Sequence, residues 1–349
     1  MKDGKFLVLG IESSCDDTSA SVVADGRELL SLSISSQIDI HTLYGGVVPE
    51  IASRNHIKNI NAVIDEAMEK AGLDFDDIDL IGVTCGPGLI GSLVVGVSAA
   101  KALAFAADKP LVGVHHLQGH ISADFIEYPE LEPPFTAVVA SGGNTDIVDV
   151  RGHNDMLMLG KTRDDAAGEA MDKVARVMGI GYPGGPVIDK LAKSGDPHAV
   201  EFGRVRLEKG SYDFSFSGLK TQVINYVNQC RMKGLEIKKE DLAASFQKAV
   251  MDVITEKALE AAHEYGRDSI ALAGGVASNS LLRSMMKDLC EANSLKLYVP
   301  RPVLCTDNAA MIACAAYYKY KEGYRDDLTL DAFPVLDLAK GARGEWTAE

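Results

Sequence analysis

The two halves of the chain repeat one order of elements, in which hairpin-forming strands are followed by strands that alternate with helices. The first half opens with an apolar run at residues 5–14, typical of a buried strand. Two further strands are joined by Asp25-Gly26, a dipeptide suited to a type I′ hairpin. The second half opens with a hairpin-rich run at residues 135–162. This order predicts an α/β protein of two related lobes with a central cleft between them.

Periodic apolar patterns predict several helices. The first has Pro49 at its start and Gly72 at its end, where these residue types are favoured. The last is expected to be capped by Thr306 or Asp307. The predicted helices cover residues 49–72, 88–107, 163–179, 241–266 and 306–323.

The length of 349 residues suggests two domains of ordinary size. Residues 126–134 contain three prolines and few apolar residues, which marks a boundary. We therefore predict an N-terminal lobe over residues 1–126 and a C-terminal lobe over residues 127–323. A final helix at about 324–349 is a candidate to pack back on the first lobe.

The net charge of −15 argues against a protein that coats nucleic acid or anionic membrane by charge alone. Local basic patches remain candidates, although a solvated surface is the more common explanation for each. They are Arg54 with Lys58, and Arg204 with Arg206 and Lys209.

Cysteine spacing and the apolar stretches indicate a soluble cytoplasmic protein. The six cysteines form no CxxC pair, so neither a disulfide framework nor a cysteine zinc site is indicated. The N-terminus leads directly into a strand pattern and shows no signal peptide. The longest apolar stretch, residues 88–107, contains Lys101, which is costly inside a membrane, so we predict a buried helix there.

Three glycine-rich turns follow predicted strands, at residues 10–19, 140–145 and 273–279. Glycine lets the backbone approach a ligand and leaves N–H groups for phosphate or carboxylate oxygens. Glycine turns are also common at strand ends where no ligand binds. Neither a GxGxxG nor a Walker A motif is present.

Several carboxylates accompany turns of this kind. Glu12, Asp16 and Asp17 fit magnesium or phosphate chemistry about as well as they fit ordinary turn and cap roles. Asp172 and Asp189 lie near the Pro-Gly-Gly turn of "YPGGPVID" and could receive ligand hydroxyls, but alone they are a weak signal.

The string "GVHHLQGHISADF" places His116 and His120 four residues apart, on one face of a helix. Such a pair supplies two metal ligands, and a third must come from elsewhere. A metalloprotease would carry its general base in HExxH or HxxEH, but Leu117 and Gly119 occupy those positions. A metal with another task, or histidines of a core or helix surface, remain as alternatives.

Taken together, these motifs resemble the tRNA threonylcarbamoyladenosine transferase family, called TsaD in bacteria and formerly described as an O-sialoglycoprotein endopeptidase. The strings "ESSCDDTS" and "YGGVVPE" resemble its bacterial and organellar branch. The resemblance implies the actin-like ATPase fold of sugar kinases, with two ribonuclease-H-like lobes. It rests on the strings "GIESSCDDTS", "YGGVVPEIASRNH", "GPGLIGSLVVG", "HHLQGH", "SGGNT", "DDAAGEAMDK", "YPGGP", "GGVASN" and "CTDNAAM".

The resemblance also implies site residues. His116 and His120 match the metal-binding histidines of the family, and Asp307 matches a third ligand supplied from the opposite lobe. The implied metal is Fe²⁺, with Zn²⁺ as the alternative. The residues that match substrate-binding positions are Val139, Ala140, Ser141, Gly142, Gly143, Asp172, Gly185, Asp189 and Asn279.

The activity implied is transfer of threonylcarbamoyl from threonylcarbamoyl-AMP to N6 of adenosine 37, in the anticodon loop of tRNAs that read codons beginning with adenine. TsaB-like and TsaE-like partner proteins are implied, and ATP with Mg²⁺ is a further candidate ligand. This chain departs from the family at Asn144, where bacterial members usually have histidine, and at Gln118, where glutamate is frequent. The rival hypotheses are a small-molecule kinase of the same fold, a catalytically silent scaffold and a metalloprotease.

Overall fold

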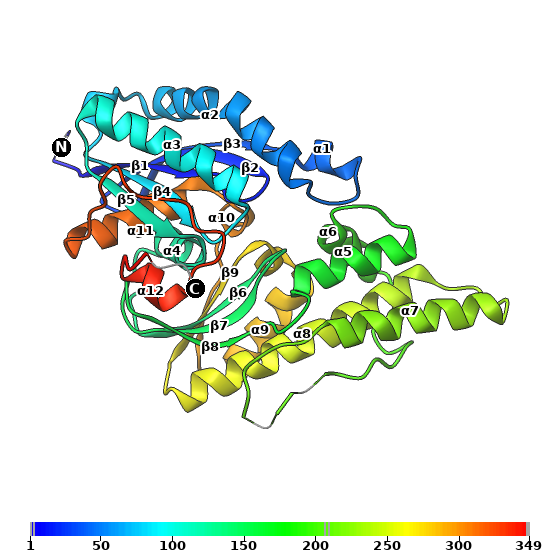
Figure 1. Cartoon of the computed structure of the whole chain (residues 1–349). Helices are drawn as coiled ribbons and strands as arrows, with labels where there is room; N and C mark the ends of the chain where they lie inside the picture. The colour runs from blue at the N-terminus through cyan, green and yellow to red at the C-terminus, as the bar shows by residue number, and fades with distance from the viewer. Residues whose placement is uncertain (1, 3, 206, 209, 347–349) are drawn as a thin grey trace. The chain divides into compact units, whose positions relative to one another are not determined.

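The computed structural model describes residues 2, 4–205, 207, 208 and 210–346, and the chain forms two compact units. The first unit comprises Met1–Pro134, Val150–Leu157 and Val303–Glu349, and the second comprises Phe135–Asp149 and Met158–Pro302. Each unit contains one five-stranded sheet with helices packed on it (Figure 1). The two-lobed α/β fold is therefore confirmed.

Both sheets have the same topology. The first has the order β3-β2-β1-β4-β5 and the second has the corresponding order β8-β7-β6-β9-β10. In the first sheet β4 and β5 run parallel to β1, and in the second β9 and β10 run parallel to β6. The first sheet contains β1 (Leu7–Glu12), β2 (Asp17–Ala24), β3 (Glu28–Ser36), β4 (Leu80–Gly86) and β5 (Leu111–His115); the second contains β6 (Phe135–Ala140), β7 (Thr145–Val150), β8 (Met156–Lys161), β9 (Ser269–Ala273) and β10 (Lys296–Tyr298).

Local sequence explains how the first sheet begins and how closely it is covered. Asp25 and Gly26, between β2 and β3, both have positive φ (49° and 74°), as a type I′ turn requires. On β1, a Cβ at Gly10 would collide with the carbonyl oxygen of Ala309. Glycine at this position therefore lets the helix that begins at Ala309 lie directly against the strand.

The helices of the first unit cover both faces of its sheet (Figure 1). The long helices α2 (Pro49–Ala71) and α3 (Ile90–Ala107) pack together on one face, and α11 (Ala309–Lys321) packs on the other beside α4 (His116–Glu127). The shorter helices of this unit are α1 (Ile38–Thr42), η1 (Phe75–Asp77), α10 (Pro302–Cys305, whose first residue falls in the second unit) and α12 (Leu338–Ala342).

The second unit packs its helices around α8. This helix contacts β6 and β9 of the sheet and four helices of the unit, α5, α6, α7 and α9. The helices of the unit are α5 (Ala167–Met178), α6 (Gly184–Ala192), α7 (Ser217–Met232), α8 (Lys239–Glu264), η2 (Gly275–Ser278) and α9 (Ser280–Ala292).

The structure divides the chain differently from the expected boundaries of 1–126 and 127–323. Residues 303–323 belong to the first unit because α11 packs against β1, β2 and β4. Residues 150–157, from the last residue of β7 to the second residue of β8, also group with the first unit. The final segment is in the first unit as well, but its helix α12 covers only five residues.

Two predicted helix starts are wrong. The helix expected from residue 163 begins at Ala167, because Asp164 instead accepts hydrogen bonds from the backbone N–H groups of Phe216 and Ser217. The helix expected from residue 306 begins at Ala309, and its N-cap is Asn308, whose side chain accepts from the N–H of Met311.

The expectation that residues 88–107 are buried is only partly correct. Helix α3 packs on α2 and β4, yet only 33% of this 18-residue helix is buried, and Phe105 is 75% exposed. Within the described residues it is the one helix long and apolar enough to cross a membrane by length and composition, which is weak evidence for a span.

Candidate functional site

The first candidate site lies in the first unit and is built by the junction of β5 and α4. The strand ends at His115 and the helix begins at His116, so His116 and His120 lie one turn apart on the same face. His115 has a structural role: its Nδ1 accepts from the N–H of Leu117, and its Nε2 lies 3.1 Å from the carbonyl oxygen of Leu336. His115 thus connects the start of the helix to the C-terminal segment.

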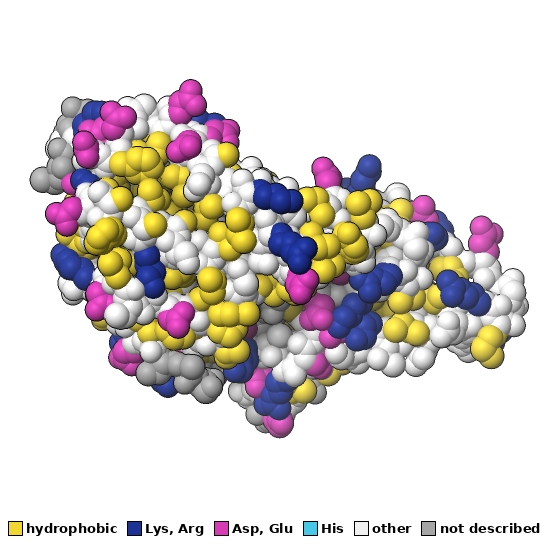
Figure 2. Space-filling model, turned by 45° about the horizontal axis from the view of Figure 1, so that its top comes forward, with side chains coloured by type: hydrophobic (Ala, Val, Ile, Leu, Met, Phe, Trp, Pro, Cys, Tyr) yellow, Lys and Arg dark blue, Asp and Glu magenta, His cyan; other side chains and the backbone are white. Residues whose placement is uncertain are grey.

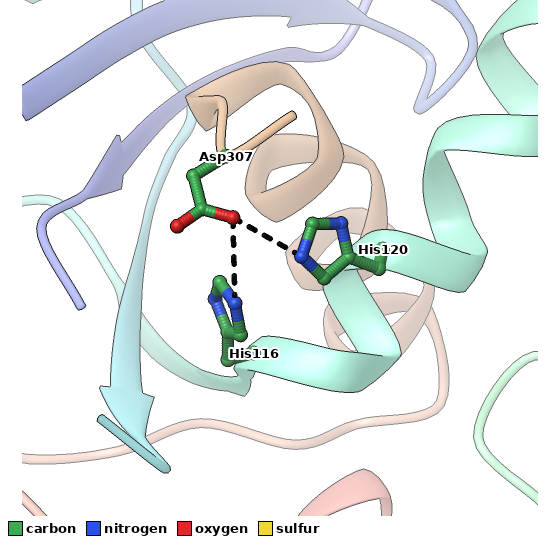
Figure 3. A group of neighbouring side chains, drawn as sticks. All are labelled: His116, His120 and Asp307. Carbon is green, nitrogen blue, oxygen red and sulfur yellow. Dashed lines mark ion pairs between the residues drawn. The ribbon is translucent and has the colours of Figure 1, made fainter. Parts of the chain in front are cut away.

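Asp307 completes a three-residue group with the two histidines (Figure 3). Its Oδ1 lies 3.1 Å from Nε2 of His120 and 3.6 Å from Nε2 of His116. One ligand atom from each residue lies within 4.8 Å of the others. The expectation that Asp307 comes from the opposite lobe is wrong, because residues 303–349 belong to the same unit as the histidines.

The donor set fits a divalent metal ion. The ring of His120 is buried, and neither of its nitrogens has a hydrogen-bond partner among the residues that the structure describes. Its Nε2 instead faces the Asp307 oxygen that also faces His116. Two imidazole nitrogens and a carboxylate oxygen are ligands suited to zinc or iron, with room left for further ligands.

Glu12 lies behind His116, on the side away from Asp307. Its Oε2 is 3.2 Å from Nδ1 of His116 and also accepts from the hydroxyl of Thr84 at 2.6 Å, while its Oε1 accepts from the N–H of Ser14 at 2.5 Å. This arrangement fixes the ring so that Nε2 is presented to the metal position. Of the three acidic residues in the first glycine turn, Glu12 is therefore the one that acts on the histidine pair.

The charges of this group support one another. Burial would lower the pKa of His116, but the carboxylates of Asp307 and Glu12 outweigh it and raise that pKa to about 9. Burial would raise the pKa of Asp307, but the two histidines lower it to about 2. The buried carboxylate of Asp307 is thus held ionised, as a metal ligand must be, whereas His116 must release its extra proton when a metal binds.

Gln118 does not face the histidine pair. Its side chain is fully buried, and its Nε2 donates to the carbonyl oxygen of His153 and to Oδ1 of Asn154. The glutamine at this position therefore leaves the three candidate ligands intact.

We expect Gln118→Glu to retain the bound metal while lowering stability by about 1–2 kcal/mol, because the His153 carbonyl loses its donor. Metal content measured by mass spectrometry and the unfolding midpoint in urea check both parts. Loss of metal in the folded variant would show that residue 118 belongs to the metal site after all.

A second candidate site lies in the second unit, at the end of β6. Val139 and Ala140 close the strand, and the turn folds back through a hydrogen bond from the N–H of Ser141 to the carbonyl oxygen of Asn144. A Cβ on Gly142 or Gly143 would meet nothing within 4 Å. The turn therefore exposes backbone that a ligand can approach closely.

Asp172 and Gly185 are brought together at the start of α6, a helix that sequence reasoning did not anticipate. Oδ1 of Asp172 accepts from the N–H of Gly184 at 2.6 Å, and Gly185 also donates to this carboxylate. Burial nevertheless raises the pKa of Asp172 above its usual value. Asp172 thus stabilises the helix start in addition to any ligand it binds.

Asp189 on α6 and Asn279 at the start of α9 also meet. Oδ1 of Asp189 accepts from the hydroxyl and the N–H of Ser280, the residue after Asn279. Gln247 on α8 joins the two side chains and was missed in the sequence. The available signal was a glutamine on a helix whose neighbouring residues are mostly apolar.

The two suggested basic patches differ, because both described arginines have acidic neighbours whereas Lys58 is exposed beside Arg54. Arg204 is paired with Asp252 at 2.6 Å, and Arg54 lies 3.8 Å from Glu50. Arg206 and Lys209 lie outside the described residues.

Comparison with known proteins finds similarity along nearly the whole chain. The family model "TsaD: tRNA N6-adenosine threonylcarbamoyltransferase" matches residues 28–314. A protein named tRNA N6-adenosine threonylcarbamoyltransferase from Clostridioides difficile is 55% identical over 95% of this chain and 98% of its own length. A protein of the same name from Clostridium perfringens is 55% identical over 96% of this chain and 99% of its own length.

Solved structures support the fold. HypF of T. kodakarensis aligns with a TM-score of 0.62 and 16% identity over 92% of this chain and 48% of its own. Component A of the (R)-2-hydroxyglutaryl-CoA dehydratase of Acidaminococcus fermentans aligns with a TM-score of 0.52 and 15% identity, over 90% of this chain and 99% of its own. At these identities the likeness concerns the fold alone.

Proposed function

Because the chain belongs to the TsaD family of tRNA N6-adenosine threonylcarbamoyltransferases, we propose how its described residues perform that transfer. The chain is a transferase that places threonylcarbamoyl on N6 of an adenosine in tRNA. The donor we propose is threonylcarbamoyl-AMP, and the acceptor is adenosine 37 of tRNAs that read codons beginning with adenine. The observation that carries this proposal is the match to named transferases at 55% identity over 95% of the chain.

The reaction is an acyl-type transfer on a mixed anhydride. The N6 amine attacks the carbamoyl carbonyl carbon, a C–N bond forms, the C–O bond to phosphate breaks, and AMP leaves while N6 loses a proton. In the second unit, the N–H groups of Gly142 and Gly143 are suited to the oxygens of the donor and to negative charge that develops during attack. Asp172, Asp189 and Asn279 would hold its hydroxyl and amine groups.

In the first unit, His116, His120 and Asp307 would hold the metal, which we propose to be Fe²⁺, with Zn²⁺ as the alternative. When bound, the metal supplies a Lewis acid that polarises and orients an oxygen. Glu12 keeps the ring of His116 in the orientation and tautomer needed for this ligand set. Neither Leu117 nor Gly119 can act as the base of a metalloprotease, so the residues around the histidine pair favour transfer over peptide hydrolysis.

We propose that TsaB-like and TsaE-like proteins assist the chain in the cytoplasm. Ile57 on α2 and Ile90, Val94 and Phe105 on α3 are all exposed, at 65%, 49%, 44% and 75%. The two helices pack against each other in the first unit, and Figure 2 shows hydrophobic side chains gathered on this side of it, which offer an apolar surface to a partner. A partner that covers this surface would also explain why α3 is apolar on its outer side.

We expect Asp172→Ala to slow transfer roughly ten- to hundredfold, because a charged hydrogen-bond acceptor for the donor is lost. This variant should also lose about 1 kcal/mol of stability, since Asp172 caps the start of α6. Asp172→Asn retains an acceptor for the Gly184 N–H, so it should restore stability without restoring the rate. Full activity in both variants would remove Asp172 from the donor site.

The proposed function is tested with unmodified tRNA, synthetic threonylcarbamoyl-AMP, the metallated chain and its partner proteins. Mass spectrometry of the nucleosides should show threonylcarbamoyl on adenosine 37, and omission of the chain should abolish the product. Unchanged adenosine 37 in the complete mixture would contradict the proposal, and so would phosphorylation of a small metabolite in its place.

A further inference from the structure

We infer that Gln247 is a positioning residue, which holds Asp189 and Asn279 in the orientation that binds the adenylate donor. This inference rests on the proposed function, because both residues are assigned to the donor there. Gln247 lies on α8, Asp189 on α6 and Asn279 at the N-terminus of α9, all within the second unit. Its amide is the one group that bonds to both side chains among the described hydrogen bonds.

The geometry of the amide is specific. Gln247 is 1% exposed, and its Nε2 lies 2.9 Å from Oδ1 of Asp189 and 2.9 Å from Oδ1 of Asn279. A primary amide nitrogen carries two hydrogens, so it can donate to both oxygens at once. Its Oε1 is buried and has no hydrogen-bond partner within the described part of the chain. Donation to these two acceptors is therefore what the side chain contributes.

For Asn279, these bonds fix which way the amide points. Its Oδ1 accepts from Gln247 and also from the N–H groups of Leu281 and Leu282, each at 3.1 Å. With the oxygen committed to three donors, the Nδ2 group must point away from them. Asn279 therefore presents an N–H group that can donate a hydrogen bond to a phosphate or hydroxyl oxygen of threonylcarbamoyl-AMP.

For Asp189, the hydrogen bonds occupy one carboxylate oxygen and leave the other available. Oδ1 accepts from Gln247 and from the N–H and hydroxyl of Ser280. Among the residues that the structure describes, Oδ2 makes only a 3.9 Å ion pair with Lys193, whose side chain is 64% exposed. Oδ2 is thus the oxygen left to accept a ribose hydroxyl or an amine of the donor. Gln247 acts through these two residues and touches no ligand atom itself.

Two substitutions separate hydrogen bonding from packing. Gln247→Met keeps much of the volume but donates nothing, whereas Gln247→Glu keeps the shape but places a carboxylate against two acceptor oxygens. We expect the KM for threonylcarbamoyl-AMP to rise roughly tenfold in the methionine variant and further in the glutamate variant, with kcat changed less than about threefold. Affinity for AMP alone, measured by calorimetry, should fall in the same order.

Ser245→Ala is the matched control. Ser245 lies on the same helix and also makes two hydrogen bonds, to the N–H of Val200 and the carbonyl oxygen of Asp196, but it contacts neither Asp189 nor Asn279. It should lower the unfolding midpoint while leaving KM for the donor unchanged.

The outcomes are distinguishable. A KM that rises in both Gln247 variants but not in Ser245→Ala supports positioning, even where all three lose stability. The positioning role is overturned if the wild-type chain transfers but both Gln247 variants have the same KM for threonylcarbamoyl-AMP and the same affinity for AMP as Ser245→Ala. Absence of transfer by the wild-type chain overturns the proposed function, and this inference with it.

Discussion

His120→Ala should yield a folded chain without bound divalent metal that modifies tRNA at least about a hundredfold more slowly. The substitution removes one of three converging ligands and leaves His116 and Asp307, which cannot hold the ion tightly. Even changes to outer partners of metal ligands commonly cost ten- to a hundredfold in affinity or activity, so loss of a ligand should cost more. Metal per chain is measured by mass spectrometry, and the rate by nucleoside analysis of tRNA.

His263→Ala provides the control for this variant. His263 lies on α8 in the second unit and is exposed, so its loss should leave the metal content and the rate unchanged. Near-stoichiometric metal in His120→Ala, with the control behaving as expected, would show that the metal is held elsewhere.

Glu12→Gln should weaken metal binding about ten- to a hundredfold without removing any ligand. The amide has nearly the same shape, and its one oxygen can keep the bond from the N–H of Ser14, while its NH2 group replaces the oxygen that accepts from Thr84 and faces His116. The negative charge beside Nδ1 of His116 is lost, however, and with it part of the basicity of the nitrogen that faces Asp307. Competition with a chromophoric chelator for Zn²⁺ measures the affinity directly.

Glu28→Gln is the matched control, because Glu28 is an exposed carboxylate that pairs with Lys5 at the surface. Both variants lose one negative charge, so a general charge effect would appear equally in each. Equal Zn²⁺ affinity of Glu12→Gln and the wild-type chain would remove Glu12 from the account of the metal centre.

Features set by local chemistry could be predicted from the sequence. Asp25-Gly26 adopts the positive φ angles that its residue types favour. The i, i+4 spacing of His116 and His120 places both on one face as soon as the segment becomes a helix. No neighbour far along the chain is needed for either feature.

Features set by long-range packing could not be predicted. Asp307 reaches the histidines because α11 returns to the first sheet, and no local pattern encodes which sheet a late helix joins. Thr306, Asp307 and Asn308 can all cap a helix, and the choice of Asn308 leaves the carboxylate of Asp307 free to face the histidines. The role of Gln247 likewise appears only once α6, α8 and α9 are packed together.

The measurement that tests the account most directly is a single-turnover transfer assay with metal-stripped and reloaded protein. The donor, tRNA and partner proteins are identical in all samples, and the metal bound by the chain is the one variable. We expect almost no threonylcarbamoyl on adenosine 37 with stripped wild-type protein, and recovery when one Fe²⁺ or Zn²⁺ per chain is restored. The His120→Ala chain should not recover with either metal. Full modification by the stripped wild-type protein, with metal absent by mass spectrometry, would contradict a metal-dependent transfer through His116, His120 and Asp307.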